Sequence, residues 1–467
     1  MKRIVILLVA VLSFVLMAFP QSKPFSTNKD LFLEELNTYL TSSTSKQDKA
    51  EAERIMSDFR GVWNMHYDEA EARLAISLYE LMRAKTANRA YYNIFTFTEI
   101  LLAAPYNGMT KADVNRFLAF ANSRFAKRQN QMDKFLKSCR DLLVDRVLGV
   151  KGATQWIAPN ANFIFPSDTA CVFEVKQCDL ILKSENDQSI IHDTHGIFNM
   201  DSHLWIGKGG RVDWSRFNIP VDKVYGEVHD YQIDLNTSNY RIENIDFYNK
   251  FYFSNACRCS FEDAVTNASP NEKTAYPKAM SNDDQMEHGV LFGDIDFLGG
   301  FGMVGNGVNF FGTGEHPAQI VFRHGKRITV KVRAKRFMLT DNSIVSNQSS
   351  ARIYLYDTLN RKTDSMYYSI DSIYHNDLGF RYNNDKKTVM LYRKDNGVGT
   401  GPFHDTYHEY DIFLEAIYWN RDGDKVEFRR LEGTSGDSEG LVSSVNYFRK
   451  SDYLKLQALD KKTRWNI

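Results

Sequence analysis

The chain has 467 residues, and its 58 basic and 58 acidic side chains give a formal net charge of zero. Hydrophobic residues make up 43% and charged residues 25%, close to an average globular protein. This composition excludes a disordered, collagen-like or coiled-coil chain, and the lack of a basic excess argues against nucleic acid as a partner. The length predicts two or three domains, each large enough to bury its own core.

The first 22 residues predict a secretory signal peptide. Lys2 and Arg3 precede an apolar stretch at positions 4–19 that is interrupted only by Ser13. A basic start followed by a short apolar segment is typical of export signals. An uncleaved membrane anchor is the alternative, but such a stretch spans only about 24 Å as a helix, against roughly 30 Å of hydrocarbon. We therefore expect an exported protein, in the periplasm, at the cell surface or outside the cell, with no transmembrane span after the signal.

Residues 23–150 predict an all-α domain of five or six antiparallel helices. Between residues 28 and 150 there are only three glycines, and apolar side chains recur at helical spacing, as in Ile55, Phe59, Val62 and Trp63. Residues 110–113 form a capping-box-like start for one helix. Gly149 is expected to end the last helix.

From residue 151 to residue 448 the hydrophobic period changes to two, which predicts a large β-rich domain. Alternation is clear at residues 172–176, 231–235, 328–333 and 352–356. Asp422 and Gly423 are expected to form a hairpin turn. Residues 449–467 are expected to form a C-terminal helix and tail.

Two sequence echoes suggest repeated strands within the β-rich domain. Residues 224–228 match residues 291–295 in type, and residues 242–248 are loosely matched by residues 370–374. We therefore predict an α+β protein with separate domains, in which a helical bundle or hairpin stack precedes a solenoid-like or jelly-roll β domain. A pair of β-sandwiches is the alternative architecture.

Five segments carry a resemblance to a known group of proteins. They are residues 205–214, 224–227, 246–249, 300–303 and 402–408. Together they resemble the N-terminal part of very large exported proteins of Bacteroidetes-type bacteria. The resemblance covers most of the chain and implies a compartment and an architecture, but no activity; it also implies a fragment or truncated form of a longer protein. The strand rhythm more weakly resembles the jelly-roll domains of lipopolysaccharide transport.

Five cysteines are present, namely Cys139, Cys171, Cys178, Cys257 and Cys259. An odd number in an exported chain leaves at least one thiol unpaired. A bridge between Cys171 and Cys178 stays open, but we expect buried or incidental thiols, and the spacing does not predict a zinc site.

Two glycine-containing motifs match the sequence patterns of enzymes, but the residues around them do not predict the structure that those enzymes need. Residues 300–305 fit a dinucleotide fingerprint, but the following residues do not predict the helix that would bind the pyrophosphate. Residues 436–440 fit a nucleophile elbow, but the last histidine, His408, precedes the serine, so an α/β-hydrolase triad cannot form. We expect turns at both motifs, and no cofactor.

Other polar and aromatic groups have competing interpretations. The pairs His404 with His408 and His192 with His195 are more often surface or capping groups than metal ligands. Asp294 and Asp296 would share a strand face, a weak indication of glycoside chemistry. Four tryptophans of the β region could stack on sugars or fill the core: Trp156, Trp205, Trp214 and Trp419.

The basic segment 323–336 is the strongest candidate for binding. Arg327, Lys331, Arg333 and Lys335 alternate with apolar residues after an expected turn near Gly325, so one strand face is cationic. Arg323 and Arg336 fall off this regular pattern. The competing interpretation is a solvated strand face that prevents edge pairing.

From these observations we expect a non-enzymatic cell-envelope protein with a structural, scaffold or interaction role. A glycan- or lipid-binding module and a carbohydrate-active β-helix enzyme are the alternatives. The expected partner is an envelope protein, an acidic glycan or a lipid phosphate.

Overall fold

The structure is a computed structural model that describes residues 24–42, 45–85, 89–265, 275–282, 287–312, 315–356, 371–394, 401–423, 425–431 and 442–444. The expected signal peptide, the 436–440 motif and the expected C-terminal helix lie outside the described residues. The chain forms two compact units. Unit 1 comprises Met1–Lys208 with Gln232–Ser238, and unit 2 comprises Gly209–Tyr231 with Asn239–Ile467.

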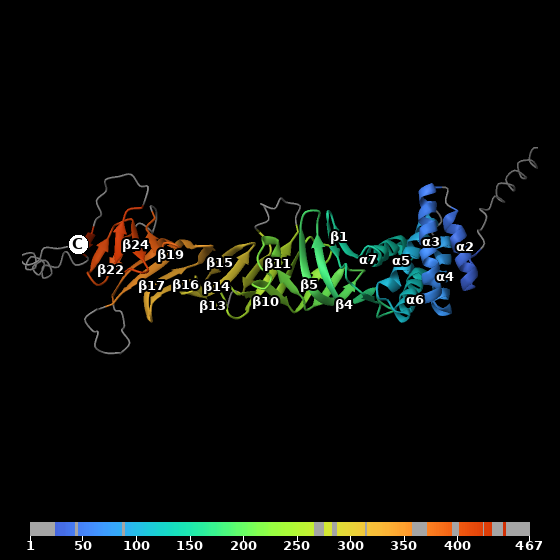
Figure 1. Ribbon diagram of the computed structural model, residues 1–467, viewed down its shortest axis with the longest axis horizontal. Helices are drawn as coiled ribbons and strands as arrows, with labels where there is room; N and C mark the ends of the chain where they lie inside the picture. Colours follow the sequence, from blue (N-terminus) through green and yellow to red (C-terminus); the bar gives the residue numbers. More distant parts are fainter. Residues whose placement is uncertain are drawn as a thin grey trace, which may run out of the picture. The chain divides into compact units, whose positions relative to one another are not determined.

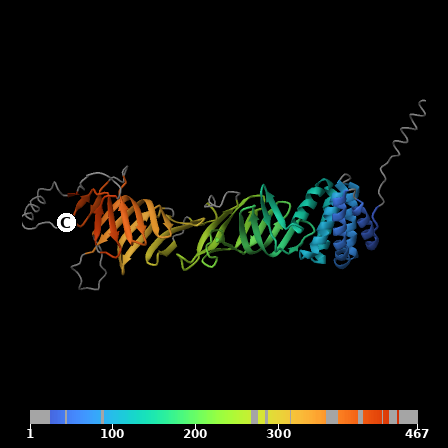
Figure 2. The ribbon, with the colours of Figure 1, turned by 45° about the horizontal axis from the view of Figure 1, so that its top comes forward.

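Unit 1 begins with helices that lie side by side (Figures 1 and 2). Alternate helices pack together, so that α3, α5 and α7 form one row and α2, α4 and α6 form the other. Rings from several helices, among them Phe32, Trp63 and Tyr79, are fully buried in the core. The six helices are α2 (Lys29–Thr41), α3 (Lys46–His66), α4 (Glu69–Lys85), α5 (Ala90–Tyr106), α6 (Lys111–Lys127) and α7 (Met132–Leu143).

The predicted capping box at the start of α6 is confirmed. The Thr110 hydroxyl accepts a hydrogen bond from the Asp113 backbone N–H, and the Asp113 carboxylate accepts one from the Thr110 backbone N–H. Two backbone donors that a helix start leaves unsatisfied are thereby paired.

Gly149 does not end a helix, which corrects the sequence-based prediction. Helix α7 ends at Leu143, and Gly149 lies inside the first strand, β1 (Val147–Lys151). The carbonyl oxygen of Leu235 lies 2.3 Å from where a Cβ of residue 149 would stand. The glycine therefore allows a close backbone approach inside unit 1.

Unit 1 also contains strands, so it extends past the change from helices to strands near residue 150. Trp156 on β2 donates its indole N–H to the carbonyl of Thr237 at 2.9 Å, which ties the segment Gln232–Ser238 to this unit. The strands are β2 (Thr154–Ile157), β3 (Phe163–Ile164), β4 (Val172–Lys183), β5 (Gln188–Asn199) and β6 (Leu204–Lys208), with β9 (Asp230–Asp234) at the unit boundary.

Unit 2 is built from antiparallel strands that follow one another in chain order along the unit (Figure 1). The strands are β7 (Arg211–Asp213), β8 (Val224–Val228), β10 (Asn239–Asn249), β11 (Cys257–Ala264), β12 (Lys278–Ser281), β13 (Glu287–Leu291), β14 (Ile295–Val304), β15 (Gly307–Phe311), β16 (Ala318–His324), β17 (Arg327–Ala334), β18 (Arg336–Thr340), β19 (Ser343–Leu355), β20 (Asp371–Asn383), β21 (Thr388–Tyr392), β22 (Phe403–Asp405), β23 (Tyr410–Ile412), β24 (Ala416–Asn420), β25 (Val426–Arg429) and β26 (Val442–Ser444).

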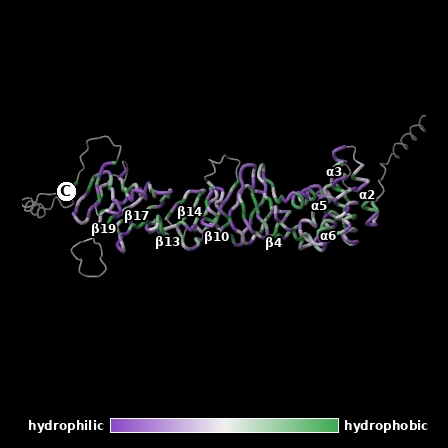
Figure 3. Tube along the Cα trace, in the orientation of Figure 1, coloured by the Kyte–Doolittle hydropathy of each residue, from purple (hydrophilic) through white to green (hydrophobic). Residues whose placement is uncertain are grey.

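Long strands in unit 2 each hold two shorter strands along one edge. The first half of β14 pairs with β13 and β16, and its second half pairs with β12 and β15. Along β19, one end pairs with β18 and the other with β17. Apolar and polar positions alternate along many strands (Figure 3), and buried rings such as Phe297 and Phe310, 4.1 Å apart, fill the interior.

The sequence echo between residues 224–228 and 291–295 is not a repeated strand. Residues 224–228 form β8, whereas β13 ends at Leu291 and β14 begins at Ile295. Phe292 and Gly293 lie between them with positive φ angles of 49° and 89°, and the Asp294 N–H donates to the Leu291 carbonyl. With Asp294 they form a three-residue loop between the paired Leu291 and Ile295, which is a short hairpin connection.

The predicted order, helices followed by a large antiparallel β region, is confirmed. The hairpin turn at Asp422 and Gly423 is also confirmed, since Trp419 on β24 pairs with Val426 on β25. Within the described ranges, no helix combines the length and hydrophobicity that crossing a bilayer requires.

Candidate functional site

The hairpin of β16 and β17 carries the basic residues singled out in the sequence. Its turn consists of Gly325 and Lys326, and Gly325 adopts the left-handed conformation, with φ of 59°. Along β17 the apolar Val330, Val332 and Ala334 are buried. Arg333 is exposed and Lys331 is partly exposed, so the predicted alternation of an apolar and a cationic face is present from Val330 to Ala334. Arg327 is also exposed, but the register shift before Val330 interrupts the alternation there. Lys335 is exposed in the bend just after the strand.

Strand register adds a cation that the sequence pattern did not predict. Lys331 lies opposite Arg352 of β19, and Arg333 lies opposite Ser350. Directly opposed residues of paired strands project from the same face of the sheet. Arg352, which is exposed, therefore joins Lys331 and Arg333 on one surface.

Alternation along β16 brings Arg323 to the same face. Arg323 lies two residues after Val321, which is opposite Lys331. The extra residue of the bulge, Thr329, belongs to β17. Burial, followed by the charges of Arg333 and Arg323, lowers the pKa of the Lys331 ammonium. Arg323 is therefore close enough to Lys331 to disfavour its charged form, although the sequence pattern did not place Arg323 on the cationic strand face. Arg336 lies apart on β18, where it donates hydrogen bonds to Asn309.

We call this surface the cationic face and define it by Arg323, Arg327, Lys331, Arg333, Lys335 and Arg352. Arg323 forms an ion pair with Asp296, with 2.5 Å between Nε and Oδ2. For Lys331, Arg333 and Arg352, no carboxylate within ion-pair distance occurs in the described part of the chain. Their charges are available to an anion.

Aromatic side chains border these cations. The Arg352 guanidinium lies 5.0 Å from the ring centre of Tyr374, and that ring lies 5.2 Å from the ring of His404. Arg327 lies 5.6 Å from the ring of Tyr356. Rings beside cations offer both stacking and charge to a ligand.

Three histidines of the two pairs lie beside aspartates. The His404 Nδ1 lies 2.6 Å from an Asp411 oxygen, whereas the His408 Nδ1 lies 2.8 Å from an Asp405 oxygen. The His192 Nδ1 lies 3.7 Å from an Asp179 oxygen. A search of the described residues finds no group of three or more side chains that could hold a metal ion.

Asp294 lies in the turn before β14 and only Asp296 lies on the strand, which corrects the prediction of a shared strand face. A different arginine holds each carboxylate. Arg421 donates two hydrogen bonds to Asp294, at 2.7 and 2.8 Å, and Arg323 pairs with Asp296. The hydrogen bonds from Arg421 lower the pKa of the Asp294 carboxyl, and burial opposes that shift only partly. A glycoside hydrolase needs one of its two carboxyls protonated, and this environment disfavours protonation of Asp294.

The Asp294 ion pair predicts an acid-dependent loss of stability. Because the pKa is lower in the folded chain than in the unfolded chain, the stabilisation is present above about pH 4 and is lost as pH falls through the folded pKa. The Asp294 side chain is 57% exposed, so screening limits the effect to roughly 0.5 kcal/mol. We expect Asp294→Asn to lose less stability than the wild type between pH 7 and pH 3, as measured by urea unfolding. Asp341→Asn in the turn after β18 is the control, and equal losses in all three proteins would contradict the assignment.

The glycine motif at residues 300–305 lies at the end of β14 and in the following turn, and strand β15 comes next. A dinucleotide site needs a helix start there, and none follows. The expectation of a turn is confirmed for Gly305, whereas Gly300 and Gly302 lie inside β14, which corrects it for them.

The four tryptophans of the β region are core residues. Trp156, Trp205 and Trp214 are at most 1% exposed, and Trp419 is 7% exposed. Such burial leaves their ring faces unavailable for stacking on a sugar. Tyr356 and Tyr374, which are partly exposed beside the cationic face, are therefore the better candidates.

The five cysteines are free and buried. Burial raises the pKa of the Cys171 and Cys178 thiols to about 12, so neither is a reactive thiolate at neutral pH. The open possibility of a bridge between Cys171 and Cys178 is thereby excluded, since both thiols are free in the structure.

Comparison with known proteins assigns neither a family nor a function to the chain. No protein-family model, no curated protein and no solved structure matches the chain.

Proposed function

We propose that this chain is a non-enzymatic cell-envelope interaction protein that binds an acidic glycan through the cationic face. The observation that carries the proposal is the placement of Lys331, Arg333 and Arg352 on neighbouring strands, without carboxylate partners among the described residues and next to a partly exposed ring. A solvated strand face needs neither the cross-strand cation nor the ring.

The spacing of the cations suits a charged polymer better than a single small anion. Residues two apart on a strand are separated by about 6.7 Å, and adjacent strands by about 4.8 Å. Lys331 and Arg333 are two apart on β17, and Arg352 lies across from Lys331. A chain of sugar carboxylates offers anions at several such separations, and its rings can stack on Tyr374.

For the architecture we propose a twisted jelly roll. The long strands β14, β19 and β20 each hold two successive short neighbours along an edge, which supports a sheet that bends into two layers. The described pairings are antiparallel, whereas a β-helix stacks parallel strands. This pattern gives little support to the solenoid-like architecture or to a β-helix enzyme.

Export also belongs to the proposal. It is supported by the basic and apolar pattern of residues 1–22 and by the resemblance to large exported Bacteroidetes-type proteins. We propose that the chain works in the periplasm, at the cell surface or outside the cell, as part of that group.

The test is a titration of the full chain with polygalacturonate, a polymer of sugar carboxylates, and with neutral dextran. We expect saturable binding of polygalacturonate only, weakening as salt is added because surface charges are screened. In the Lys331→Glu, Arg333→Glu variant the dissociation constant should rise about 30-fold. This value follows because two exposed charge contacts are lost, each of which contributes roughly 1 kcal/mol to the binding free energy.

A matched control carries the same charge change on other exposed strand positions of unit 2, Arg258→Glu with Arg381→Glu. This variant should bind like the wild type. Equal losses in both variants would show general charge attraction and would overturn the assigned face. Binding of vesicles with anionic lipid headgroups, but not of polygalacturonate, would replace the glycan by a lipid phosphate.

A further inference from the structure

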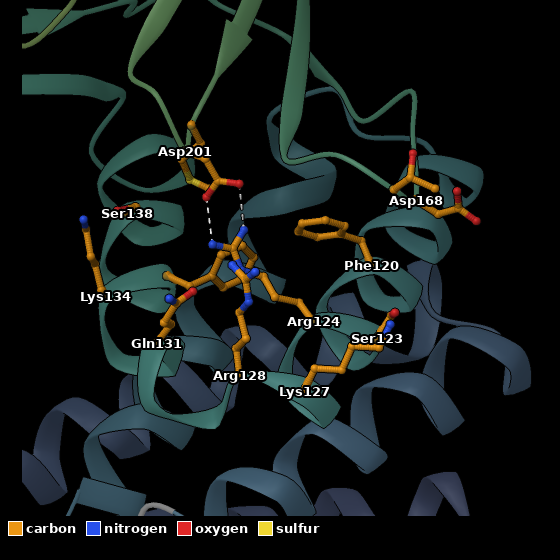
Figure 4. A pocket seen from close by; sticks show the side chains of 13 residues that line it. Phe120, Ser123, Arg124, Lys127, Arg128, Gln131, Lys134, Ser138, Asp168 and Asp201 are labelled. Atoms are coloured by element: carbon orange, nitrogen blue, oxygen red, sulfur yellow. Dashed lines mark hydrogen bonds and ion pairs between the residues drawn. The ribbon is translucent and has the colours of Figure 1, made fainter.

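Unit 1 contains a hollow that is independent of the cationic face. Its volume is about 760 Å³, within the range of small-molecule sites. It lies between the end of α6, the start of α7 and the segments around residues 168 and 200 (Figure 4). The residues that matter most are Phe120, Arg124, Lys127, Arg128, Lys134 and Phe135.

One wall of the hollow is a fixed arginine. Arg124 donates two hydrogen bonds to the Asp201 carboxylate, at 2.8 and 2.9 Å. Its guanidinium lies 5.7 Å from the ring centre of Phe120 and 5.3 Å from that of Phe135. The Nε of Arg124 is buried and has no hydrogen-bond partner, so one donor of this wall is unsatisfied. Asp201 therefore fixes the Arg124 side chain, while the Nε–H of Arg124 makes no hydrogen bond.

The hollow is lined by more basic than acidic side chains. Four basic and two acidic side chains line it, which leaves an excess of two positive charges. Lys127, Arg128 and Lys134 are exposed, and no ion pair to a described carboxylate neutralises any of them. Figure 4 shows Arg128 directed from the end of α6 toward the Arg124–Asp201 pair, while Asp168 lies away from these cations.

The floor of the hollow is apolar. The rings of Phe120 and Phe135 are 7% and 5% exposed, and Met200 is 5% exposed. The hydroxyls of Ser123, Ser138 and Thr169 also line the hollow. A ligand bound there would meet this apolar floor, of which each side chain exposes only a small part, on one side and the cations on the other.

We propose that this hollow binds a small organic phosphate ester. A phosphomonoester carries a charge of about −1.5 to −2 at neutral pH, which matches the excess of two positive charges. The guanidinium of Arg128 suits the geometry of phosphate oxygens, and Lys127 and Lys134 supply further charge. The organic part would lie against the small exposed portion of the apolar floor formed by Phe120, Phe135 and Met200.

The test is isothermal titration of the full chain with phenyl phosphate, which carries both the anion and a ring. We expect a dissociation constant below about 1 mM. Inorganic phosphate lacks the ring and should bind at least about fivefold more weakly, and benzyl alcohol lacks the charge and should not bind. Arg128→Gln with Lys134→Gln should weaken phenyl phosphate binding about tenfold.

Lys137→Gln is the matched control, because Lys137 lies on α7 with its side chain 79% exposed and outside the hollow. It should bind phenyl phosphate like the wild type. The proposal is overturned if phenyl phosphate shows no saturable binding, if the double variant binds as well as the control, or if inorganic phosphate binds as tightly. None of these results would change the glycan titration, since the cationic face belongs to unit 2.

Discussion

Replacing Trp214 by alanine is expected to lower the free energy of unfolding by about 4 kcal/mol. The Trp214 side chain is fully buried in unit 2, with its ring centre 5.1 Å from that of Phe247 and 5.7 Å from that of Phe261. Alanine would leave a cavity that these rings fill only in part. Calorimetry of the full chain, which can resolve the unfolding of two units, is the measurement.

Phenylalanine at the same position separates packing from hydrogen bonding. The indole Nε1 of Trp214 is buried without a hydrogen-bond partner, so Trp214→Phe loses volume but no hydrogen bond. We expect this variant to cost only about 1 to 1.5 kcal/mol. If Trp214→Ala were as stable as the wild type and lost binding of polygalacturonate, Trp214 would be a sugar-stacking residue and the assignment to the core would be wrong.

The second large effect is expected for Gly149→Ala in unit 1, at about 3 kcal/mol of destabilisation. The new Cβ would stand 2.3 Å from the Leu235 carbonyl oxygen and 3.0 Å from the Leu235 Cβ. The first of these atoms belongs to the backbone, so a side-chain rotation cannot relieve the clash. The segment Gln232–Ser238 would have to move, although the indole of Trp156 holds it at Thr237.

The matched control is Gly61→Ala on helix α3, where the added Cβ has no atom within 4 Å. Alanine is a better helix former than glycine, so this variant should be more stable by about 0.5 to 1 kcal/mol. Calorimetry of both variants checks the pair of predictions. A stable Gly149→Ala protein would show that Leu235 does not approach β1 as closely as described.

The helices could be predicted because their determinants are close together in the sequence. The stripe that contains Ile55, Phe59 and Trp63 is buried in α3, as its spacing predicts. The capping box of Thr110 and Asp113 involves residues three apart. By contrast, Gly149 was assigned to a helix end because glycine is common there, while its close approach to Leu235 involves residues far apart in the chain.

In the β region the sequence alone determined the alternation of β17, with Val330 and Val332 inside and Arg333 outside. It also determined the turn at Gly325, since a period of two and a residue that tolerates positive φ are local properties. Neighbouring residues in the sequence did not determine whether a tryptophan such as Trp214 lies in the core or at the surface. Both roles use the same residue type, and only the layers that cover it decide its exposure.

Only the tertiary structure decided which distant residues share a surface. Arg352 joins the cationic face through its register with Lys331, and Arg323 joins it because Val321, two residues earlier on β16, is opposite Lys331. Asp294 and Asp296 are held by two different arginines, Arg421 from the turn after β24 and Arg323 from β16. The hollow of unit 1 forms where Arg128 and Lys134 meet the segment of Asp201. The physical reason is that spacing along one strand or helix sets the direction of a side chain, whereas its neighbours depend on long-range pairing that the spacing leaves open.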